Sequence, residues 1–314
     1  MLGNRKGTYI LALLASVCPI DPGRAAEFAF SSYGLGGAAF GAGVTPPQGT
    51  YVTIASAYYD GEIGGPVTIG GIVLDVGMAA KFFSQAVNVL YVPERKVFGG
   101  NFGASVTIPV GHIDIDAQVT GPLGNTVEES VDGWGLGDMS GRLQLGWTPR
   151  QDFSHTVYVQ AVAPTGKYDP NGLQPNIGLN RPGIDTGWAF TWTEPTSKLQ
   201  FNGAVGVTFN FENTETDYDS GTDFHFEWAI GYEICKGLIV GPAGYSYRQL
   251  TGDSGPGAVL GPFEGEVDAV GGGLSYTTLI GTTPLILGAR YYEEFNAKHR
   301  MDGSTTFLSG TMRF

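Results

Sequence analysis

The stretch from Leu199 to Ile234 decides the fold: it reads LQFNGAVGVTFNF at 199–211 and, after an acidic, glycine-containing gap, FHFEWAIGYEI at 224–234. In both runs most large apolar residues occupy every second position, with polar or small residues between them. Successive side chains of a β-strand point to opposite faces, so each run has one apolar and one polar face. Runs of this length exceed the ~5–6 residues usual in soluble sheets and suffice for the ~9–11 that cross a bilayer. The pattern predicts a transmembrane β-hairpin, with a pair of long soluble sandwich strands as the alternative.

The overall composition is typical of a membrane barrel. Among the 314 residues there are 50 glycines, and only 15% are charged. A mean hydropathy of +0.01 suits strands in which lipid-facing residues alternate with lumen-facing ones. The N-terminus is followed by no apolar run of the ~18 residues that indicates a transmembrane helix. A net charge of −13 disfavours a nucleic acid partner, because binding phosphates needs a basic surface.

The N-terminus has the pattern of a secretory signal peptide over residues 1–26. Arg5 and Lys6 precede a short apolar core, and cleavage is expected after Ala25 or Ala26. Cys235 is then the single cysteine of the mature chain, so no internal disulfide is expected.

Residues 27–48 are rich in glycine and alanine and end in a Thr45-Pro46-Pro47 sequence. They have no strand period and too much glycine for a stable helix. Two interpretations stay open: a flexible periplasmic leader, or a plug folded into the lumen of the barrel that residues 49–314 are expected to form.

The rest of the chain predicts an all-β, up-and-down antiparallel barrel. The twelve expected strands cover 50–59, 79–92, 98–110, 136–147, 154–163, 185–194, 198–211, 223–235, 238–250, 264–277, 284–294 and 304–314. Connections after odd-numbered strands are long and those after even-numbered strands are short, as in bacterial outer-membrane barrels. Residues 113–117 also alternate and could prolong the third strand, so fourteen strands remain possible.

The chain ends in Phe314, with Met312 on the same face. A terminal aromatic strand of this kind is typical of proteins recognised by the outer-membrane assembly machinery. We therefore expect the bilayer and that machinery as partners. The expected location is the outer membrane of a Gram-negative bacterium, with long loops extracellular and both termini periplasmic.

Four segments resemble one family of outer-membrane proteins, the family named for the meta-pathway of phenol degradation. They are TPPQGTY at 45–51, TDYDSGTDFH at 216–225, GYSYRQLTGDSG at 244–255, and residues 290–303, the last with Glu294, Lys298 and Arg300. The resemblance covers nearly all of the mature chain and implies a transporter-like barrel associated with aromatic degradation. Passive uptake of small hydrophobic or aromatic molecules is the function it implies.

Parity along the strands selects candidate lumen-lining residues. A polar face inside the barrel would receive Asp114, Asp116, Arg142, Gln200, Asn202, His225, Glu227, Arg248, Arg290 and Glu294. Ion pairs such as Glu227 with Arg248 could then brace the wall. These groups either line a permeation path or only satisfy one another in a filled lumen.

Two functions compete with the channel. The first is a structural or adhesive barrel with a closed lumen, and the second is a barrel hydrolase that uses His225 with a serine such as Ser246. The chain contains no Gly-x-Ser-x-Gly elbow, so we expect no enzyme and no cofactor. The loop at 217–223 is similar to a calcium loop but lacks the downstream bidentate glutamate, so no metal site is expected.

Overall fold

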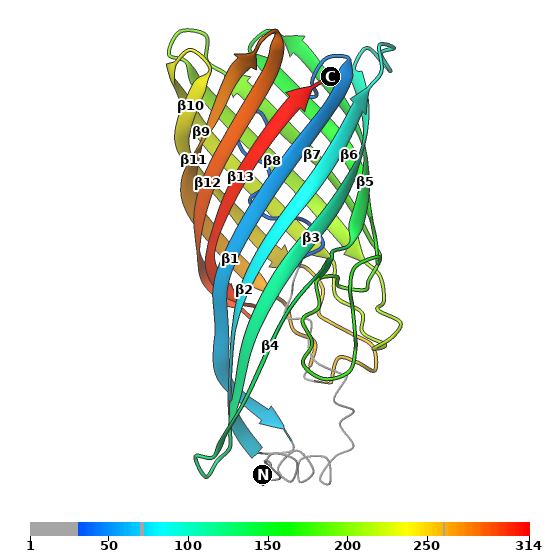
Figure 1. The fold of residues 1–314 in the computed structure, drawn as a ribbon, viewed down its shortest axis with the longest axis vertical. Coiled ribbons are helices and arrows are strands. Elements are labelled where there is room, and N and C mark those ends of the chain that lie inside the picture. Colours follow the sequence, from blue (N-terminus) through cyan, green and yellow to red (C-terminus); the bar gives the residue numbers. More distant parts are fainter. Residues whose placement is uncertain (1–30, 70–71, 260) are drawn as a thin grey trace.

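The chain folds as one antiparallel sheet of thirteen strands that closes on itself into a barrel (Figure 1). The computed structural model describes residues 31–69, 72–259 and 261–314, so the expected signal peptide at 1–26 lies outside the described residues. The strands are β1 (Gly49–Ile69), β2 (Ile72–Val92), β3 (Asn101–Thr120), β4 (Thr126–Leu136), β5 (Met139–Arg150), β6 (Phe153–Ala163), β7 (Gly183–Thr193), β8 (Leu199–Asn210), β9 (Asp223–Cys235), β10 (Leu238–Gln249), β11 (Glu266–Ile280), β12 (Thr283–Lys298) and β13 (Asp302–Arg313). Over the described stretches, no helix is long and apolar enough to cross a membrane.

Twelve of these strands form the closed ring, which confirms the predicted barrel. From β5 to β13 each strand pairs with its sequence neighbour, β13 pairs with β1, and β1, β2 and β3 follow before β3 meets β5. β4 stands outside the ring, because within the described part of the chain it pairs with β3 alone. Closure leaves the ring without a free edge, so its backbone groups are hydrogen-bonded between strands, as a bilayer requires.

The two ends of the barrel differ, as the loop lengths predict. We call the end that carries the short turns and Phe314 the turn end, and the opposite end the loop end (Figure 1). At the turn end β9 and β10 are joined by Lys236 and Gly237 alone, with Gly237 in the left-handed region at φ 80°. At the loop end three loops, 164–182, 211–222 and 250–265, connect successive hairpins.

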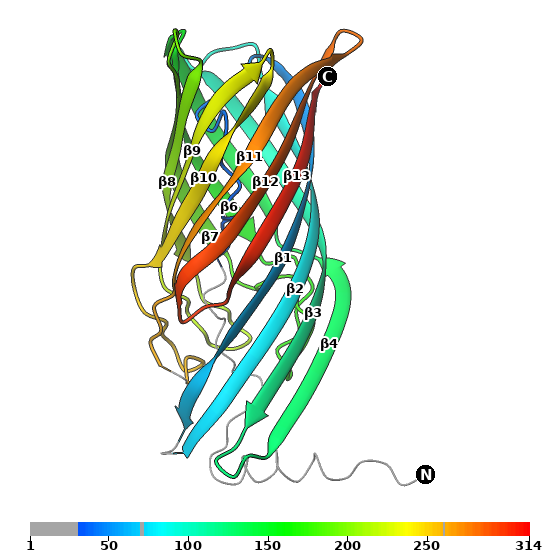
Figure 2. The ribbon, with the colours of Figure 1, turned by 90° about the vertical axis from the view of Figure 1, so that its left-hand side faces the viewer.

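Two predicted loops are wrong: much of 60–78 and of 111–135 is strand. β1 continues to Ile69, β2 begins at Ile72, and the alternating residues 113–117 prolong β3 to Thr120, where β4 turns back. Pairing of β1 with β13 stops at Glu62 with Asp302, and pairing of β3 with β5 stops at Thr107 with Ser140. Beyond those points residues 63–69, 72–78, 113–120 and 126–133 form a four-stranded sheet that projects past the rim (Figure 2). We call this sheet the extension.

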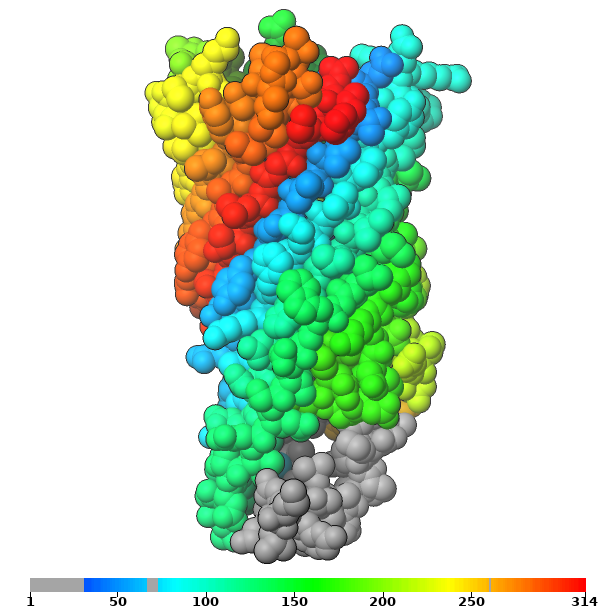
Figure 3. Space-filling view, in the orientation of Figure 1, coloured from blue at the N-terminus to red at the C-terminus, as the bar shows by residue number. Residues whose placement is uncertain are grey.

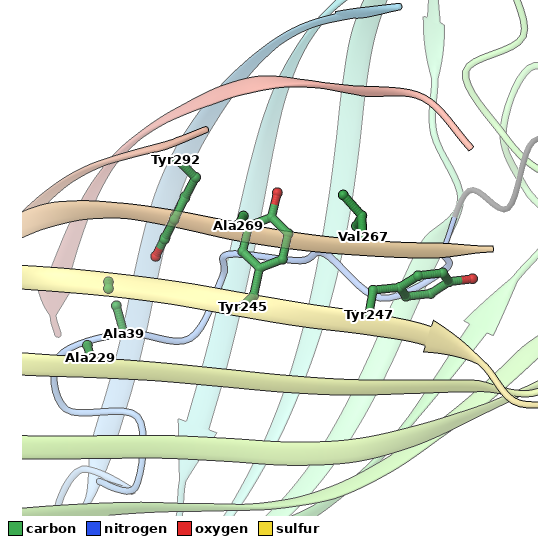
Figure 4. Close-up of a cluster of buried hydrophobic side chains, with 8 residues drawn as sticks. Ala39, Ala229, Tyr245, Tyr247, Val267, Ala269 and Tyr292 are labelled. Atoms are coloured by element: carbon green, nitrogen blue, oxygen red, sulfur yellow. The ribbon is translucent and has the colours of Figure 1, made fainter. Parts of the chain in front are cut away.

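Residues 31–48 lie inside the barrel, and their contacts define its inward face. Ala39 from this segment packs with inward side chains of β9 to β12 in one apolar cluster (Figure 4). The cluster contains Ala39, Ala229, Ala243, Tyr245, Tyr247, Val267, Ala269 and Tyr292. The opposite face carries exposed apolar side chains such as Phe226, Ile230 and Leu308. In the space-filling view β13, β1 and β2 form adjacent oblique bands of this outer surface (Figure 3).

Candidate transport lumen

The N-terminal segment, residues 31–48, is hydrogen-bonded to one strand of the wall after another. The Ala38 amide donates to Glu227 on β9 (2.8 Å), and the Gly41 amide donates to Asn202 on β8 (2.9 Å). The Gly43 amide then donates to Thr191 on β7 (3.0 Å). Glu227 is fully buried and Asn202 and Thr191 are nearly so. Side chains of the wall therefore replace the strand or helix partners that the segment's own backbone lacks.

The segment continues around the lumen towards the turn end. The Thr45 hydroxyl lies 2.9 Å from the Thr156 hydroxyl on β6 and accepts from Gln144 on β5. Asn101 on β3 donates to the carbonyl of Pro46 at 3.2 Å. The segment thus passes β9, β8, β7, β6, β5 and β3 in order before β1 begins at Gly49.

Near the loop end aromatic and cationic side chains hold the first part of the segment. The Tyr33 ring stacks on His225, and Arg290 donates to the Gly37 carbonyl at 2.7 Å. Ser32 donates to Asn210 at the loop end of β8. The described chain therefore starts at the loop end, opposite to Phe314.

His225 also belongs to a buried polar group of the wall. Its Nε2 lies 2.9 Å from Asp185 of β7, whose carboxylate accepts a hydrogen bond from Thr208 of β8. All three side chains are fully buried or nearly so. Buried polar groups of this kind are stable only when they are paired, so this cluster fixes β7, β8 and β9 against each other.

Glu294 joins four elements at the loop end of the lumen. Its carboxylate accepts from the hydroxyls of Tyr59 (3.0 Å) and Tyr245 (2.8 Å) and from the Gly303 amide (3.1 Å). The guanidinium of Arg300, itself almost fully buried, lies 3.5 Å away. This arrangement ties β1, β10 and β12 to the turn that leads into β13.

The three long loops fold together over part of the loop end. The Asp138 carboxylate accepts from the amides of Gly166 (2.8 Å) and Leu179 (2.7 Å), which shapes the loop at 164–182. In the same loop, hydrogen bonds from the backbone and side chain of Asn171 lower the pKa of the Asp169 carboxyl. A bridge between Asp219 and Ser254 joins the other two loops.

The structure places most of the predicted lumen residues on the inward face. Arg142 lies over the ring of Tyr158, with its guanidinium carbon 3.5 Å from the ring centroid, and Gln200 accepts from Asn202. The inward residues are Arg142, Gln200, Asn202, His225, Glu227, Arg290 and Glu294.

Three predicted lumen residues face outward instead. Asp114 and Asp116 pair with Lys81 and Ala79, on the face opposite to Ile113 and Ile115. The expectation was wrong because β3 has passed the rim at this level, so its apolar side turns inward and its polar side meets water. Asp116 here lines an acidic hollow of about 750 Å³ together with Glu62, Glu128 and Asp302.

Arg248 is the third predicted lumen residue that faces outward. Tyr245 and Tyr247 take the inward positions of β10, so Arg248 lies on the outer face and binds both oxygens of Asp268 at 2.8 Å. The predicted ion pair of Glu227 with Arg248 is therefore wrong, because the two side chains lie on opposite faces.

The hydrolase arrangement fails for the same reason. Ser246 points outward and donates to Asp268 at 2.6 Å, whereas His225 points into the lumen. Within the described ranges, no group of three or more His, Cys, Asp or Glu side chains is arranged to hold a metal ion.

Sequence reasoning missed the inward tyrosines and Asp185. The two-residue turn at Lys236 and Gly237 could not have found the tyrosines, because a register shift after Leu238 places Gly244 opposite Trp228, a lipid-facing residue by pattern. Tyr245 and Tyr247 then fall on the other face by alternation.

The comparisons with known proteins agree with this architecture. The sequence pattern of the family described as "Putative MetA-pathway of phenol degradation" matches residues 61–309. The chain belongs to this family. The match spans the ring from the loop end of β1 through β12 and most of β13, together with the extension.

Solved structures share the fold at low sequence identity. The COG4313 outer membrane channel from Pseudomonas putida F1 is 13% identical, with a TM-score of 0.65 over 86% of this chain and 97% of that chain. At this identity the likeness shows the fold alone, which is that of a barrel of the outer membrane of Gram-negative bacteria.

Other barrels resemble it more distantly. The CymD monoaromatic hydrocarbon channel is 10% identical, with a TM-score of 0.42 over 86% of this chain and 89% of that chain. The translocator domain of the autotransporter NalP from Neisseria meningitidis is 11% identical, with a TM-score of 0.40 over 86% and 90%. No curated protein matches the chain.

Proposed function

We propose that this protein is a passive channel of the outer membrane for small hydrophobic molecules, aromatic compounds among them. Membership of a family named for phenol degradation supports this substrate class. The observation that carries the proposal is the part of the inward surface that the N-terminal segment leaves uncovered, where Ala55, Ala57, Phe82 and Ala86 of β1 and β2 are half-buried inside a closed barrel. An interior of this kind favours apolar solutes over sugars or ions, because apolar surface is removed from water on binding.

The proposed orientation follows the barrel layout. The long loops and the extension would face the medium, and Phe314 at the turn end would face the periplasm, where the assembly machinery engages the last strand. Residues 31–48 would act as a plug that narrows the lumen and excludes large hydrophilic solutes. The hydrogen bonds of the Ala38, Gly41 and Gly43 amides to the wall support a segment that is held in place rather than a flexible leader.

The test measures uptake of the fluorescent hydrophobic probe N-phenyl-1-naphthylamine by de-energised Gram-negative cells with and without the gene. The expected result is faster probe uptake in cells that carry the protein. Swelling of liposomes in arabinose, measured with the purified protein, should stay slow. Equal rates of probe uptake in the two strains would overturn the proposal.

One observation favours a second candidate, a structural barrel with a closed lumen. The side chains of Thr208, His225 and Glu227 are completely buried, so this part of the lumen is filled. A closed barrel predicts neither probe uptake nor conductance, whereas the channel predicts probe uptake. The same experiment therefore separates the two functions.

A further inference from the structure

In the middle of the barrel the N-terminal segment fills the lumen unevenly. Inward side chains of β8 to β10 lie buried beneath the N-terminal segment, among them Thr208, Glu227 and Ala243, which are each 0% exposed. On the opposite side, inward residues of β1 and β2 such as Ala57 and Ser84 remain half-buried. The segment therefore covers one part of the wall and leaves the other accessible.

Hydrogen bonds of the segment show the same asymmetry. Among the described residues, its hydrogen bonds with β1, β2 and β3 lie at the turn end. Tyr51 donates to the Pro47 carbonyl at 2.8 Å, and Asn101 donates to the carbonyls of Thr45 and Pro46. The Gly36 backbone approaches the ring of Phe307 on β13, so the segment reaches β13. Within the described ranges it makes no hydrogen bond to the middle of β1 or β2.

The uncovered wall carries a continuous strip of small and apolar side chains. Every second pair of the β1–β2 ladder faces inward, and we call these pairs the β1–β2 strip. From the lumen to the extension they are Ala55 with Ala86, Ala57 with Ser84, Tyr59 with Phe82, Gly61 with Ala80, and Ile63 with Met78. All but Gly61 and Ala80 are half-buried.

The strip continues onto the inner face of the extension. There Ile63 and Met78 pack with Val131 against a buried cluster that includes Ile115 and Met301. Tyr59 belongs to this cluster and also donates to Glu294 inside the barrel, which shows that the apolar face and the lumen lie on the same side of the sheet. Leu173 contacts the cluster from the loop at 164–182.

The outer face of the same sheet has the opposite character. Glu62, Asp116, Glu128 and Asp302 line the hollow there. On the inner face Glu129 lies beside Ala117, and the side chains from Met78 and Ile63 towards the lumen are apolar. This apolar part of the inner face is the surface of the extension that favours an apolar solute.

We propose that the hydrophobic solute binds first on the inner face of the extension and then passes along the β1–β2 strip, beside an N-terminal segment that stays seated. This inference rests on the proposed function and adds its route. Residues 55, 57, 84 and 86 carry small side chains, and Tyr59 with Phe82 forms the aromatic step between extension and lumen.

The test places a tryptophan on either face of the same ladder. Ser84→Trp fills the strip, whereas Ser56→Trp lies on the outer face, where Ser56 pairs with Gln85. We expect a severalfold loss of N-phenyl-1-naphthylamine uptake for Ser84→Trp and none for Ser56→Trp. Both proteins must show the heat-dependent gel mobility of a folded barrel. Wild-type uptake by Ser84→Trp would overturn the route, and no uptake by the wild type would overturn the proposed function instead.

A second pair of variants tests the first binding surface without crowding the lumen. Met78→Glu puts a charge on the inner face of the extension, and Ala79→Glu puts the same charge on the outer face. Loss of uptake confined to Met78→Glu supports the route. The route is contradicted if both variants lose uptake equally, or if neither variant loses uptake.

Accessibility can be measured even if Ser84→Trp fails to fold. In a Cys235→Ser background, a cysteine at Ser84 should react with a charged, water-soluble thiol reagent, and a cysteine at Ser56 should not. Added N-phenyl-1-naphthylamine should slow the reaction of the thiol reagent with the cysteine at residue 84. If the cysteine at residue 84 does not react in the folded barrel, the β1–β2 strip is inaccessible and the route is wrong.

Discussion

The ring of Tyr33 lies on the imidazole of His225, with centroids 3.6 Å apart and planes 13° from parallel. This stack joins the N-terminal segment to a wall residue that Asp185 holds in place. A stacked aromatic pair contributes about 0.5–1.5 kcal/mol beyond the area it buries. The contact is thus a local anchor for a segment that has no strand pairing of its own.

Removing this anchor should loosen the segment. For Tyr33→Ala we expect faster hydrogen exchange at the amides of Ala38 and Gly41, by up to about tenfold for a loss near 1.4 kcal/mol. Tyr33→Phe retains the stack and loses only the hydroxyl that is hydrogen-bonded to Glu227, so its exchange should rise less than that of Tyr33→Ala. Unchanged exchange in Tyr33→Ala would mean that the hydrogen bonds alone seat the segment.

Gly43 should not tolerate a side chain. A Cβ there would lie 2.4 Å from backbone atoms of Phe190, which cannot move without distorting β7. We therefore expect Gly43→Ala to lift the segment from β7 and to raise single-channel conductance in planar bilayers. Gly34→Ala is the matched control, because a Cβ at Gly34 meets no atom within 4 Å. Similar conductance in both variants would contradict the seated position of residue 43.

Loss of the Glu294 carboxylate should destabilise the loop end of the barrel. Glu294→Ala leaves Arg300 buried without its partner and frees two tyrosine hydroxyls, a change that costs about 3–5 kcal/mol for a buried ion pair. The measurement is the temperature at which gel mobility changes from the folded to the unfolded form. Glu293→Ala, on the outer face of the same strand, should shift it little.

The face that a charge occupies should decide its effect on ion selectivity. Arg142 points into the lumen over Tyr158, and its removal should raise the preference of the residual conductance for cations. Asp116 faces outward at the extension, where salt screens charges beyond about 8 Å. Asp116→Ala should therefore leave the reversal potential in a salt gradient unchanged. A shift as large as that of Arg142→Ala would contradict the assignment of faces.

Alternation and turn spacing predict the ring well. The hairpin of residues 199–234 is found as β8 and β9, and most strand ends fall close to their expected positions. This works because a barrel strand in a bilayer must be apolar on one face along its whole crossing, so the period of two is strong in the sequence.

Polarity alone does not give the faces everywhere. The rule that apolar residues face lipid fails for Ile113 and Ile115, because that part of β3 lies beyond the rim and packs on its own inner cluster. It fails again at Tyr245 and Tyr247, whose rings are apolar but whose hydroxyls bind buried carboxylates. Tyrosine suits either face, so only the strand register decides.

The position of the N-terminal segment was not predictable from its own residues. Its glycines and alanines have no period, and its partners are single side chains such as Glu227, Asn202 and Thr191 on three different strands. Contacts of this kind arise from the closed ring, in which residues distant in sequence meet across a lumen.

The seam between β1 and β13 also concerns the position of the N-terminal segment. Thr50 and Phe314 exchange backbone hydrogen bonds there, and Arg313 donates to the Gln48 carbonyl, the last residue before β1. Pairing of β1 with β13 therefore also fixes the point at which the N-terminal segment joins the wall. Residues 31–48 therefore enter the lumen from the turn end and run towards the loop end, so closing the seam sets where the segment starts within the ring.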